Sequence, residues 1–230
     1  MIYGIHWDLH SPLAFAISIL PILLIGMKVT VEATILGFLV ALLLGLVLAL
    51  LRRVPLRIIA WPTAVVIEFL RDTPLLVQLF FLYYVLPKYG VTLPALFTGV
   101  LALGVQYSAY TSEVYRAGLD AIDRGQVEAA TALNLSRARL YRTIILPQAI
   151  PRIIPALGNY LVSMIKDTPV LSTVTVMEML NLAQIVGDRT FRYLIPLTIV
   201  GALFLLLTVI ASTAVNRLDR VLPKEGVPLR

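Results

Sequence analysis

The 230-residue sequence contains no cysteine, and charged residues make up only 14% of it, about half the share usual in soluble domains. Without cysteine there is no disulfide, thiol nucleophile or thiolate metal ligand. The sequence also lacks the Gly-x-x-x-x-Gly-Lys-Ser/Thr loop that holds nucleotide phosphates, and it shows no catalytic-triad or paired-carboxylate pattern. We therefore expect no catalytic residue, no metal site and no cofactor bound by this chain.

Long uncharged apolar runs are present instead, over residues 33–51, 74–87, 89–112 and 193–215. A helix of roughly 20 apolar residues crosses a bilayer core, and buried helices of soluble proteins are rarely so long or so numerous. We predict an all-α integral membrane protein with about five transmembrane helices, over residues 28–51, 60–87, 92–116, 152–180 and 191–214.

Residues 13–26 form a further apolar segment, which Pro21 interrupts. Because an internal proline removes a backbone hydrogen bond, we expect an interfacial helix or an extension of the first span, with a sixth span as the alternative. The chain then divides into three parts: an N-terminal periplasmic or interfacial segment (1–25), a transmembrane domain (26–216) and a cytoplasmic tail (217–230).

Lysine and arginine are distributed unevenly about these spans, and such residues accumulate on the cytoplasmic side of a membrane. One side carries Arg52, Arg53, Arg57, Arg116, Arg124, Arg137, Arg139, Arg142, Arg152, Arg217, Arg220, Lys224 and Arg230. The other side carries Lys88, Arg189 and Arg192. We predict that the N-terminus is outside and the C-terminus inside. We therefore attribute the net charge of +6 to membrane topology and not to nucleic-acid binding.

Small residues recur every four positions in the first span, at Gly37, Ala41, Gly45 and Ala49. Such a ridge lets a second helix approach closely in lipid. Because glycine and alanine are also common in spans generally, composition alone is the alternative explanation. The ridge predicts helix packing and carries no information about a substrate.

The longest segment outside the spans, residues 116–152, has the pattern of two short helices. Residues 126–133 are good helix formers, and Asn134 tolerates the left-handed conformation that ends a helix. Ser136 is a suitable N-cap for a second helix over 137–145, which we expect Pro147 to stop. The pattern predicts a helix-turn-helix that rests on its own chain or on a partner.

Charged residues also occur inside two predicted spans, within motifs that match 95 positions apart. The first motif is Arg-Asp-Thr-Pro-Leu-Leu at 71–76, and the second is Lys-Asp-Thr-Pro-Val-Leu at 166–171. Arg57 and Arg152 obey the same offset. The charges lie about 14 residues, or roughly 21 Å of helix, from these arginines. Both motifs should therefore lie deep in a hydrocarbon core about 30 Å thick.

A charge at that depth costs roughly 2.5–3.5 kcal/mol if it faces lipid, so these residues should face each other or water. Pro74 and Pro169 should break their helices, which is tolerated only against protein or a cavity. One hypothesis is a polar, solute-binding cavity lined by Lys166, Asp167, Thr168, Glu68, Arg71, Asp72 and Thr73. The alternative is that Arg71–Asp72 and Lys166–Asp167 pair internally and only hold the core together.

The loop motifs resemble those of a known transporter family. Glu128-Ala129-Ala130, followed by Ile144-x-Leu146-Pro147, is similar to the EAA loop of ATP-binding-cassette (ABC) importer permeases. Further strings resemble the polar amino-acid uptake branch: Gly125-Gln126-x-Glu128-Ala129-Ala130-x-Ala132-Leu133, Leu146-Pro147-Gln148-Ala149, Arg71-Asp72-Thr73-Pro74-Leu75-Leu76, Ala109-Tyr110-x-x-Glu113-x-x-Arg116 and Lys166-Asp167-Thr168. These motifs occur in order over about residues 22–220.

Two details refine the resemblance. The family's usual glycine after the EAA helix is Asn134 here, which bears on how tight that turn is. The string Asn134-Leu135-Ser136, together with Ser108-Ala109-Tyr110-Thr111, looks most similar to permeases for ectoine and hydroxyectoine.

The resemblance implies a type I (MetI-like) ABC importer permease in a bacterial inner membrane. It implies that a partner ATPase is engaged by Gln126, Glu128, Ala129, Ala130, Leu133, Asn134, Leu146 and Pro147. The implied partners are a second permease, identical or different, two ATPases that bind ATP and Mg²⁺, and an extracytoplasmic solute-binding protein. The implied solute is small and polar or zwitterionic: an amino acid or an ectoine-type compatible solute.

Other functions are compatible with the spans alone. A self-sufficient secondary transporter or channel could use the intramembrane charges for ion coupling, but it leaves residues 125–148 without a role. A membrane enzyme or scaffold lacks a catalytic group. The 125–148 loop could also lie on lipid headgroups as an amphipathic segment.

Overall fold

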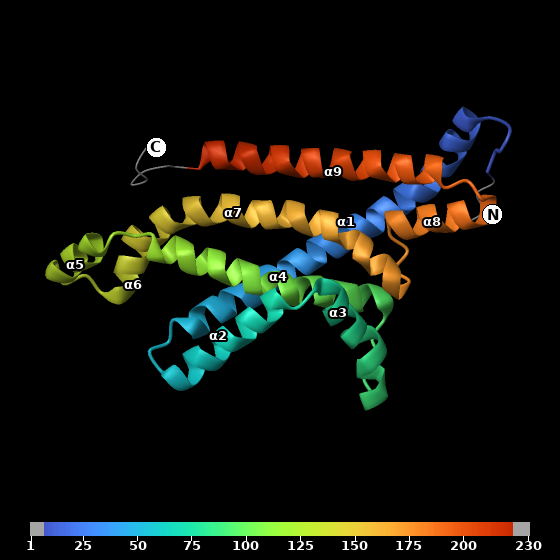
Figure 1. Ribbon diagram of the computed structural model, residues 1–230. Helices are drawn as coiled ribbons and strands as arrows, with labels where there is room; N and C mark the ends of the chain where they lie inside the picture. The colour runs from blue at the N-terminus through green and yellow to red at the C-terminus, as the bar shows by residue number, and fades with distance from the viewer. Residues whose placement is uncertain (1–6, 223–230) are drawn as a thin grey trace.

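The computed structural model describes residues 7–222, in which every regular element is helical (Figure 1). In chain order the elements are α1 (Pro12–Arg52), α2 (Arg57–Asp72), α3 (Leu75–Phe80), η1 (Phe81–Val85), η2 (Leu86–Tyr89), α4 (Ala95–Asp120), α5 (Arg124–Ala132), α6 (Arg137–Leu140), η3 (Tyr141–Ile145), α7 (Leu146–Asp167), η4 (Thr168–Val174), α8 (Met179–Thr190) and α9 (Leu194–Val221). Helix α1 crosses the other long helices obliquely, whereas α4, α7 and α9 run roughly side by side.

Helix α1 is one continuous helix of 41 residues, so Pro21 does not interrupt it. The expected interruption is wrong, and residues 13–26 extend the first span. The helix holds together because side chains on both sides of the proline, such as Ile19 and Leu23, are buried against α8 and α9. At roughly 60 Å, α1 is about twice as long as a hydrocarbon core is thick. It therefore has to tilt or extend beyond the membrane.

The small-residue ridge packs as the sequence predicts. Gly37, Ala41, Gly45 and Ala49 are all buried, and α1 makes its most extensive contact with α4. A Cβ added at Gly45 would lie 2.0 Å from Oγ1 of Thr111. The Thr111 hydroxyl also donates a 2.8 Å hydrogen bond to the Ala41 carbonyl. The close-packing prediction is confirmed.

The second predicted span, 60–87, breaks before Pro74 as expected, into two helical segments that meet at an angle (Figure 1). Thr73 is extended (φ −92°, ψ 130°), because the residue before a proline is disfavoured in the α conformation. The side chain of Gln78 donates to the carbonyls of Leu70 (2.9 Å) and Thr73 (3.3 Å). These bonds satisfy backbone acceptors that the break would otherwise leave exposed.

The fourth predicted span, 152–180, changes course in the same way. Helix α7 ends at Asp167, Pro169 lies in the first turn of the 3₁₀ segment η4, and Thr175 is left-handed (φ 64°). Helix α8 then leaves at a 48° bend and was not expected as a separate element. The fully buried Glu178 caps α8 by accepting from the backbone N–H groups of Leu180 (2.9 Å) and Asn181 (2.7 Å).

Among residues 7–222, two helices have the length and apolarity of a membrane crossing, α1 and α9, and the bent unit of residues 137–190 is a third if it is taken as one span. The third and fifth predicted spans correspond to α4 and α9. Residues 217–221 of the predicted tail belong to α9, whereas residues 223–230, with Lys224 and Arg230, lie outside the described part.

The loop after α4 contains the predicted helix-turn-helix, with one correction. Asn134 is left-handed (φ 53°), and the Ser136 hydroxyl accepts a 3.4 Å hydrogen bond from the Arg139 amide. Pro147, however, does not stop the second helix, which continues through η3 into α7. In this π-helical turn the Leu146 amide bonds five residues back, to Tyr141, and the wider turn accommodates the proline ring.

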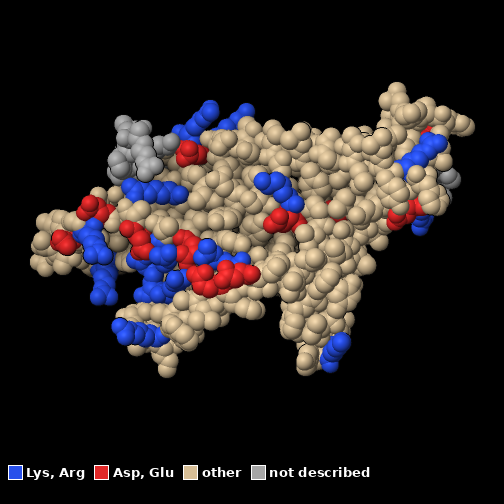
Figure 2. Space-filling view, in the orientation of Figure 1, with Lys and Arg blue, Asp and Glu red and all other residues tan. Residues whose placement is uncertain are grey.

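The second helix and α7 thus form one continuous helical unit from Arg137 through Asp167. It packs on α4, and the approach is very close near its middle. A Cβ added at Gly118 of α4 would lie 2.2 Å from Cγ1 of Ile153. Lysine and arginine gather on the surface at the α5–α6 end of the molecule (Figure 2).

Candidate functional site

Polar side chains meet where the α2–α3 break, the middle of α4 and the end of α7 come together. The Tyr107 hydroxyl donates a 2.6 Å hydrogen bond to Oδ2 of Asp167. The rings of Tyr110 and Tyr160 are stacked, with centroids 5.5 Å apart, and Tyr107 lies edge-on to both, at 5.8 and 6.2 Å. The Arg71 guanidinium is 5.9 Å from the centroid of the Tyr110 ring. We call Arg71, Tyr107, Tyr110, Tyr160 and Asp167 the tyrosine site.

Beside this site, the buried side chain of Gln106 has only part of its hydrogen-bonding capacity satisfied by the described residues. Its side chain is buried, and Nε2 donates to the carbonyl of Thr73 at 3.4 Å. Its Oε1 is buried and has no donor among the described residues. Buried acceptors in native proteins nearly always have a donor, so we expect water or a polar ligand to donate to this oxygen.

The predicted site residues are only partly brought together. Asp167 and Arg71 belong to the tyrosine site, and Thr73 contributes its backbone carbonyl. The hydroxyls of Thr73 and Thr168 bond to carbonyls of their own helices, at 2.6 and 2.7 Å. Helix formation already occupies these two hydroxyls.

The internal ion pairs of the alternative hypothesis are absent from the described residues. Arg71 pairs with Glu68, one helical turn earlier, at 3.4 Å instead of with Asp72. Asp167 bonds to Tyr107 instead of Lys166, and the side chains of Asp72 and Lys166 are exposed. Within each charged motif, therefore, the basic and the acidic residue do not form an ion pair with each other.

Sequence reasoning missed three members of the neighbourhood: Gln106, Tyr107 and Tyr160. A signal for them did exist. Tyr160 precedes Asp167 by seven residues, which places both on one face of α7, and Tyr107 and Tyr110 are three residues apart on α4. What the sequence does not show is that these two faces meet.

The α5–α6 loop presents a second candidate surface. Ala130 is buried in a small core with Ile122, Leu140 and Ile145, so α5 is held against its own chain. The opposite face leaves Glu128 and Ala129 exposed, and Leu133 is 74% exposed. Gln126 accepts a 2.5 Å hydrogen bond from Gln148, while Asn134, Leu146 and Pro147 are exposed. This exposed face is the part of the loop that its own chain leaves uncovered.

Among residues 7–222, no three histidine, aspartate or glutamate side chains converge in a way that could hold a metal ion. The candidate surfaces are therefore a polar site among helix breaks and a docking face at one end.

Residues 41–222 match the model of a family described as the binding-protein-dependent transport system inner membrane component. The chain belongs to this family. Among other members, a probable amino-acid ABC transporter permease of Sinorhizobium fredii is 62% identical over the full length of both chains. An L-cystine transport system permease of Bacillus subtilis is 35% identical, over 96% of this chain and 94% of its own.

The fold of this inner membrane component matches solved transporters. A crystal structure of an amino acid ABC transporter with histidines superposes with a TM-score of 0.85 at 35% identity, covering 89% of this chain and 95% of that one. An inward-facing methionine ABC transporter gives 0.73 at 18% identity, over 89% and 98%, and shows the fold alone. The MetI-like fold expected from the sequence is confirmed. The resemblance to ectoine permeases in particular is not among these findings.

Proposed function

We propose that the chain is the permease subunit of an ABC importer that moves a small zwitterionic solute, an amino acid or an ectoine-type compatible solute, into the cytoplasm. The observation that supports this most directly is the tyrosine site. It places a carboxylate, a guanidinium and three aromatic rings among broken helices, in a family of transport components. Transporters commonly bind substrate at such breaks.

The chemistry of the tyrosine site suits a zwitterion. Asp167 would attract a positive nitrogen, and Arg71 would attract a carboxylate. The stacked rings of Tyr110 and Tyr160 would hold the solute by cation–π and apolar contact. In this proposal Lys166, Glu68, Asp72 and Thr73 line the adjoining path, with exposed Lys166 and Asp72 facing water or the second permease. The fully buried Thr168 supports the path from behind through its bond to the Ile165 carbonyl.

The α5–α6 loop would carry the coupling to ATP hydrolysis. We assign docking on a separate ATPase to Gln126, Glu128, Ala129, Leu133, Asn134, Leu146 and Pro147, while the buried Ala130 holds α5 against its own chain. This puts the α5–α6 end in the cytoplasm and the N-terminus outside, with five crossings in the bacterial inner membrane: α1, α2–α3, α4, α7–η4 and α9. The gathering of basic residues at that end supports this orientation (Figure 2).

The complete assembly would contain a second permease, two ATPases carrying ATP and Mg²⁺, and an extracytoplasmic solute-binding protein. The test is uptake of labelled amino acids and labelled ectoine into proteoliposomes that hold the assembly, with ATP inside and the binding protein outside. Uptake should require both, and Asp167→Asn should abolish it. Asp188→Asn, an exposed carboxylate at the end of α8, serves as the control.

Uptake by the chain alone, without ATP and without partner subunits, would favour the secondary-transporter alternative. Full uptake by Asp167→Asn would remove the tyrosine site from the proposal, even if the rest of the assembly behaves as expected.

A further inference from the structure

A polar stripe runs along α4 from the tyrosine site to the end of the helix that carries the α5–α6 loop. From Tyr107 onward its residues are three or four positions apart, so each lies next to the following one while the stripe winds around the helix: Gln106, Tyr107, Tyr110, Glu113, Arg116 and Asp120. The two tyrosines belong to the tyrosine site. The three charged residues have no part in the function proposed so far.

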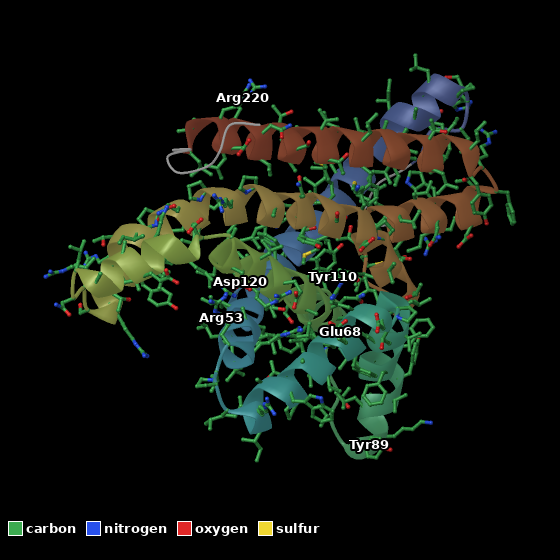
Figure 3. The ribbon with its side chains drawn as sticks, turned by 60° about the vertical axis from the view of Figure 1, so that its left-hand side comes forward. Arg53, Glu68, Tyr89, Tyr110, Asp120 and Arg220 are labelled. Atoms are coloured by element: carbon green, nitrogen blue, oxygen red, sulfur yellow. The ribbon has the colours of Figure 1, made fainter. Side chains whose placement is uncertain are left out.

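Ion pairs connect the residues of this stripe that lie nearest the α5–α6 loop. Asp120 contacts Arg53 at the end of α1 and pairs with Arg116 at 3.4 Å. Arg116 in turn pairs with Glu113 at 2.5 Å. Arg53 and Asp120 lie near one another in Figure 3, on the side of α4 that faces α2.

The ion pairs continue toward the tyrosine site through residues of α1 and α2. Arg52 contacts Glu113 at 2.9 Å and Glu68 at 3.9 Å. Glu68 pairs with Arg71 at 3.4 Å, and the Arg71 guanidinium reaches the Tyr110 ring. Glu68 and Tyr110, which both contact Arg71, are labelled in Figure 3. We call the alternating row Arg53, Asp120, Arg116, Glu113, Arg52, Glu68 and Arg71 the charge ladder.

The ladder ends in a cavity of about 690 Å³ between the end of α4 and the α5–α6 loop. Arg53 and Asp120 line it together with Arg124 and Arg137, and apolar side chains such as Ile122 and Val127 complete its wall. This volume is within the usual range for small-molecule sites. The cavity is therefore large enough for an amino acid.

The exposure of the ladder is compatible with contact with water. Its side chains are between 23% and 50% exposed even though each has a partner of opposite charge. Arg52, Arg53 and Arg116 lie at the expected cytoplasmic flank of the spans, and charges deeper in a membrane face water or partners and not lipid. Because the row is open along its length and continuous with the tyrosine site, its open side fits an aqueous path between permeases.

We infer that the charge ladder and its end cavity form the cytoplasmic half of the solute path, an exit route for zwitterionic solutes. This rests on the proposed permease function. A departing solute exchanges its ammonium and carboxylate groups between successive acidic and basic side chains. Each ladder charge already has a neighbour of opposite sign, so it holds the solute weakly enough for release, as conduction through a multi-site path requires.

The absence of cysteine makes the ladder testable by single-cysteine chemistry. Glu113→Cys and Arg116→Cys are introduced separately into the assembled complex in inside-out membrane vesicles. Each is treated with the cationic trimethylammonioethyl or the anionic sulfonatoethyl methanethiosulfonate. Val47→Cys, on an exposed apolar position of α1, is the matched control. Co-purification of the ATPases confirms that each variant assembles.

Both ladder cysteines should react at least roughly tenfold faster than Val47→Cys, with opposite preferences. Removing Glu113 leaves Arg52 and Arg116 to attract the anionic reagent, whereas removing Arg116 leaves Glu113 and Asp120 to attract the cationic one. With ATP present, a mixture of amino acids and ectoine should slow both reactions.

Modification rates equal to that of the Val47→Cys control would overturn the inference, because the ladder would then not be accessible to water. Reaction without charge preference and without solute protection would overturn it too. If the ladder reacts as expected but the uptake assay fails, the proposed function is wrong while the hydrated row stands. If uptake succeeds and the ladder does not react, only the exit route is rejected.

Discussion

The hydroxyl of Tyr107 donates a 2.6 Å hydrogen bond to the carboxylate of Asp167, across 60 residues of sequence. The bond joins the middle of α4 to the last residue of α7, where that helix gives way to the 3₁₀ segment η4. Asp167 is thereby held in a fixed direction beside three aromatic rings. A fixed carboxylate recognises a positive nitrogen without the loss of freedom that a mobile one incurs on binding.

Tyr107→Phe should weaken solute handling while leaving the fold intact. Loss of a hydrogen bond to a charged group costs about 1.5–3 kcal/mol, so we expect the apparent KM for solute to rise roughly tenfold or more. Transport by the reconstituted complex measures this. Tyr115→Phe is the matched control, since it removes a 3.4 Å bond to the Leu42 carbonyl lower on the same helix. An equal effect of both variants would contradict a role specific to Asp167.

Gly45→Ala should destabilise the protein through the α1–α4 interface. The new Cβ would meet the Thr111 Oγ1 at 2.0 Å and the Ser108 carbonyl at 2.9 Å, so the helices have to separate. We expect a loss of about 1–3 kcal/mol, seen as a lower unfolding temperature in detergent. Gly201→Ala in α9 has no neighbour within 4 Å and should be neutral or stabilising. Equal unfolding temperatures for the two variants would count against the ridge.

Leu133→Asp should detach the ATPase without unfolding the permease. The side chain is 74% exposed at the end of α5, and burying a carboxylate there in place of a leucine removes apolar contact. A central docking residue contributes about 2 kcal/mol or more, which corresponds to roughly thirtyfold weaker binding. Co-purification and affinity of the ATPase measure it. Val221→Asp, 82% exposed at the end of α9, should bind normally.

Glu178→Gln should destabilise the bend before α8. The carboxylate accepts from two backbone N–H groups, whereas an amide offers one oxygen and turns a donor toward the other. Leaving a buried donor unpaired costs about 1–3 kcal/mol. Asp123→Asn is the comparison, because that exposed cap accepts from the Gly125 amide and asparagine caps almost as well. Thermal unfolding of both variants decides whether burial makes the difference.

Local chemistry explains what the sequence could predict. Asn134 and Ser136 act through their own backbone neighbours, so the turn and cap they form follow from residue type. The ridge from Gly37 to Ala49 is readable because its spacing alone defines a helix face. Apolar run lengths likewise located α4 to within four residues at each end, and α9 to within three residues at its start and seven at its end.

The prolines show where sequence reasoning ended. Pro74 breaks a helix, and Pro169 starts a 3₁₀ segment, whereas Pro21 and Pro147 remain inside continuous helical paths. The outcome depends on what surrounds each ring: buried neighbours on α8 and α9 beside Pro21, and a π turn before Pro147. Neither condition can be read from the residues adjacent to the proline.

The tyrosine site could not be predicted from the sequence for a related reason. Of the two hypotheses for Asp167, the structure contradicts pairing with its sequence neighbour Lys166, because the hydrogen-bond donor to Asp167 is on another helix. The faces of α4 and α7 that meet depend on tertiary contacts such as the close approach of Gly118 to Ile153.

That close approach has a mechanical consequence. The helical unit from Arg137 to Asp167 is roughly 46 Å long, and Ile153 stands near its midpoint. The closest contact with α4, at Gly118, therefore divides this unit into two nearly equal lengths. We expect that a rotation about this contact would move the Arg137 end and Asp167 in opposite directions.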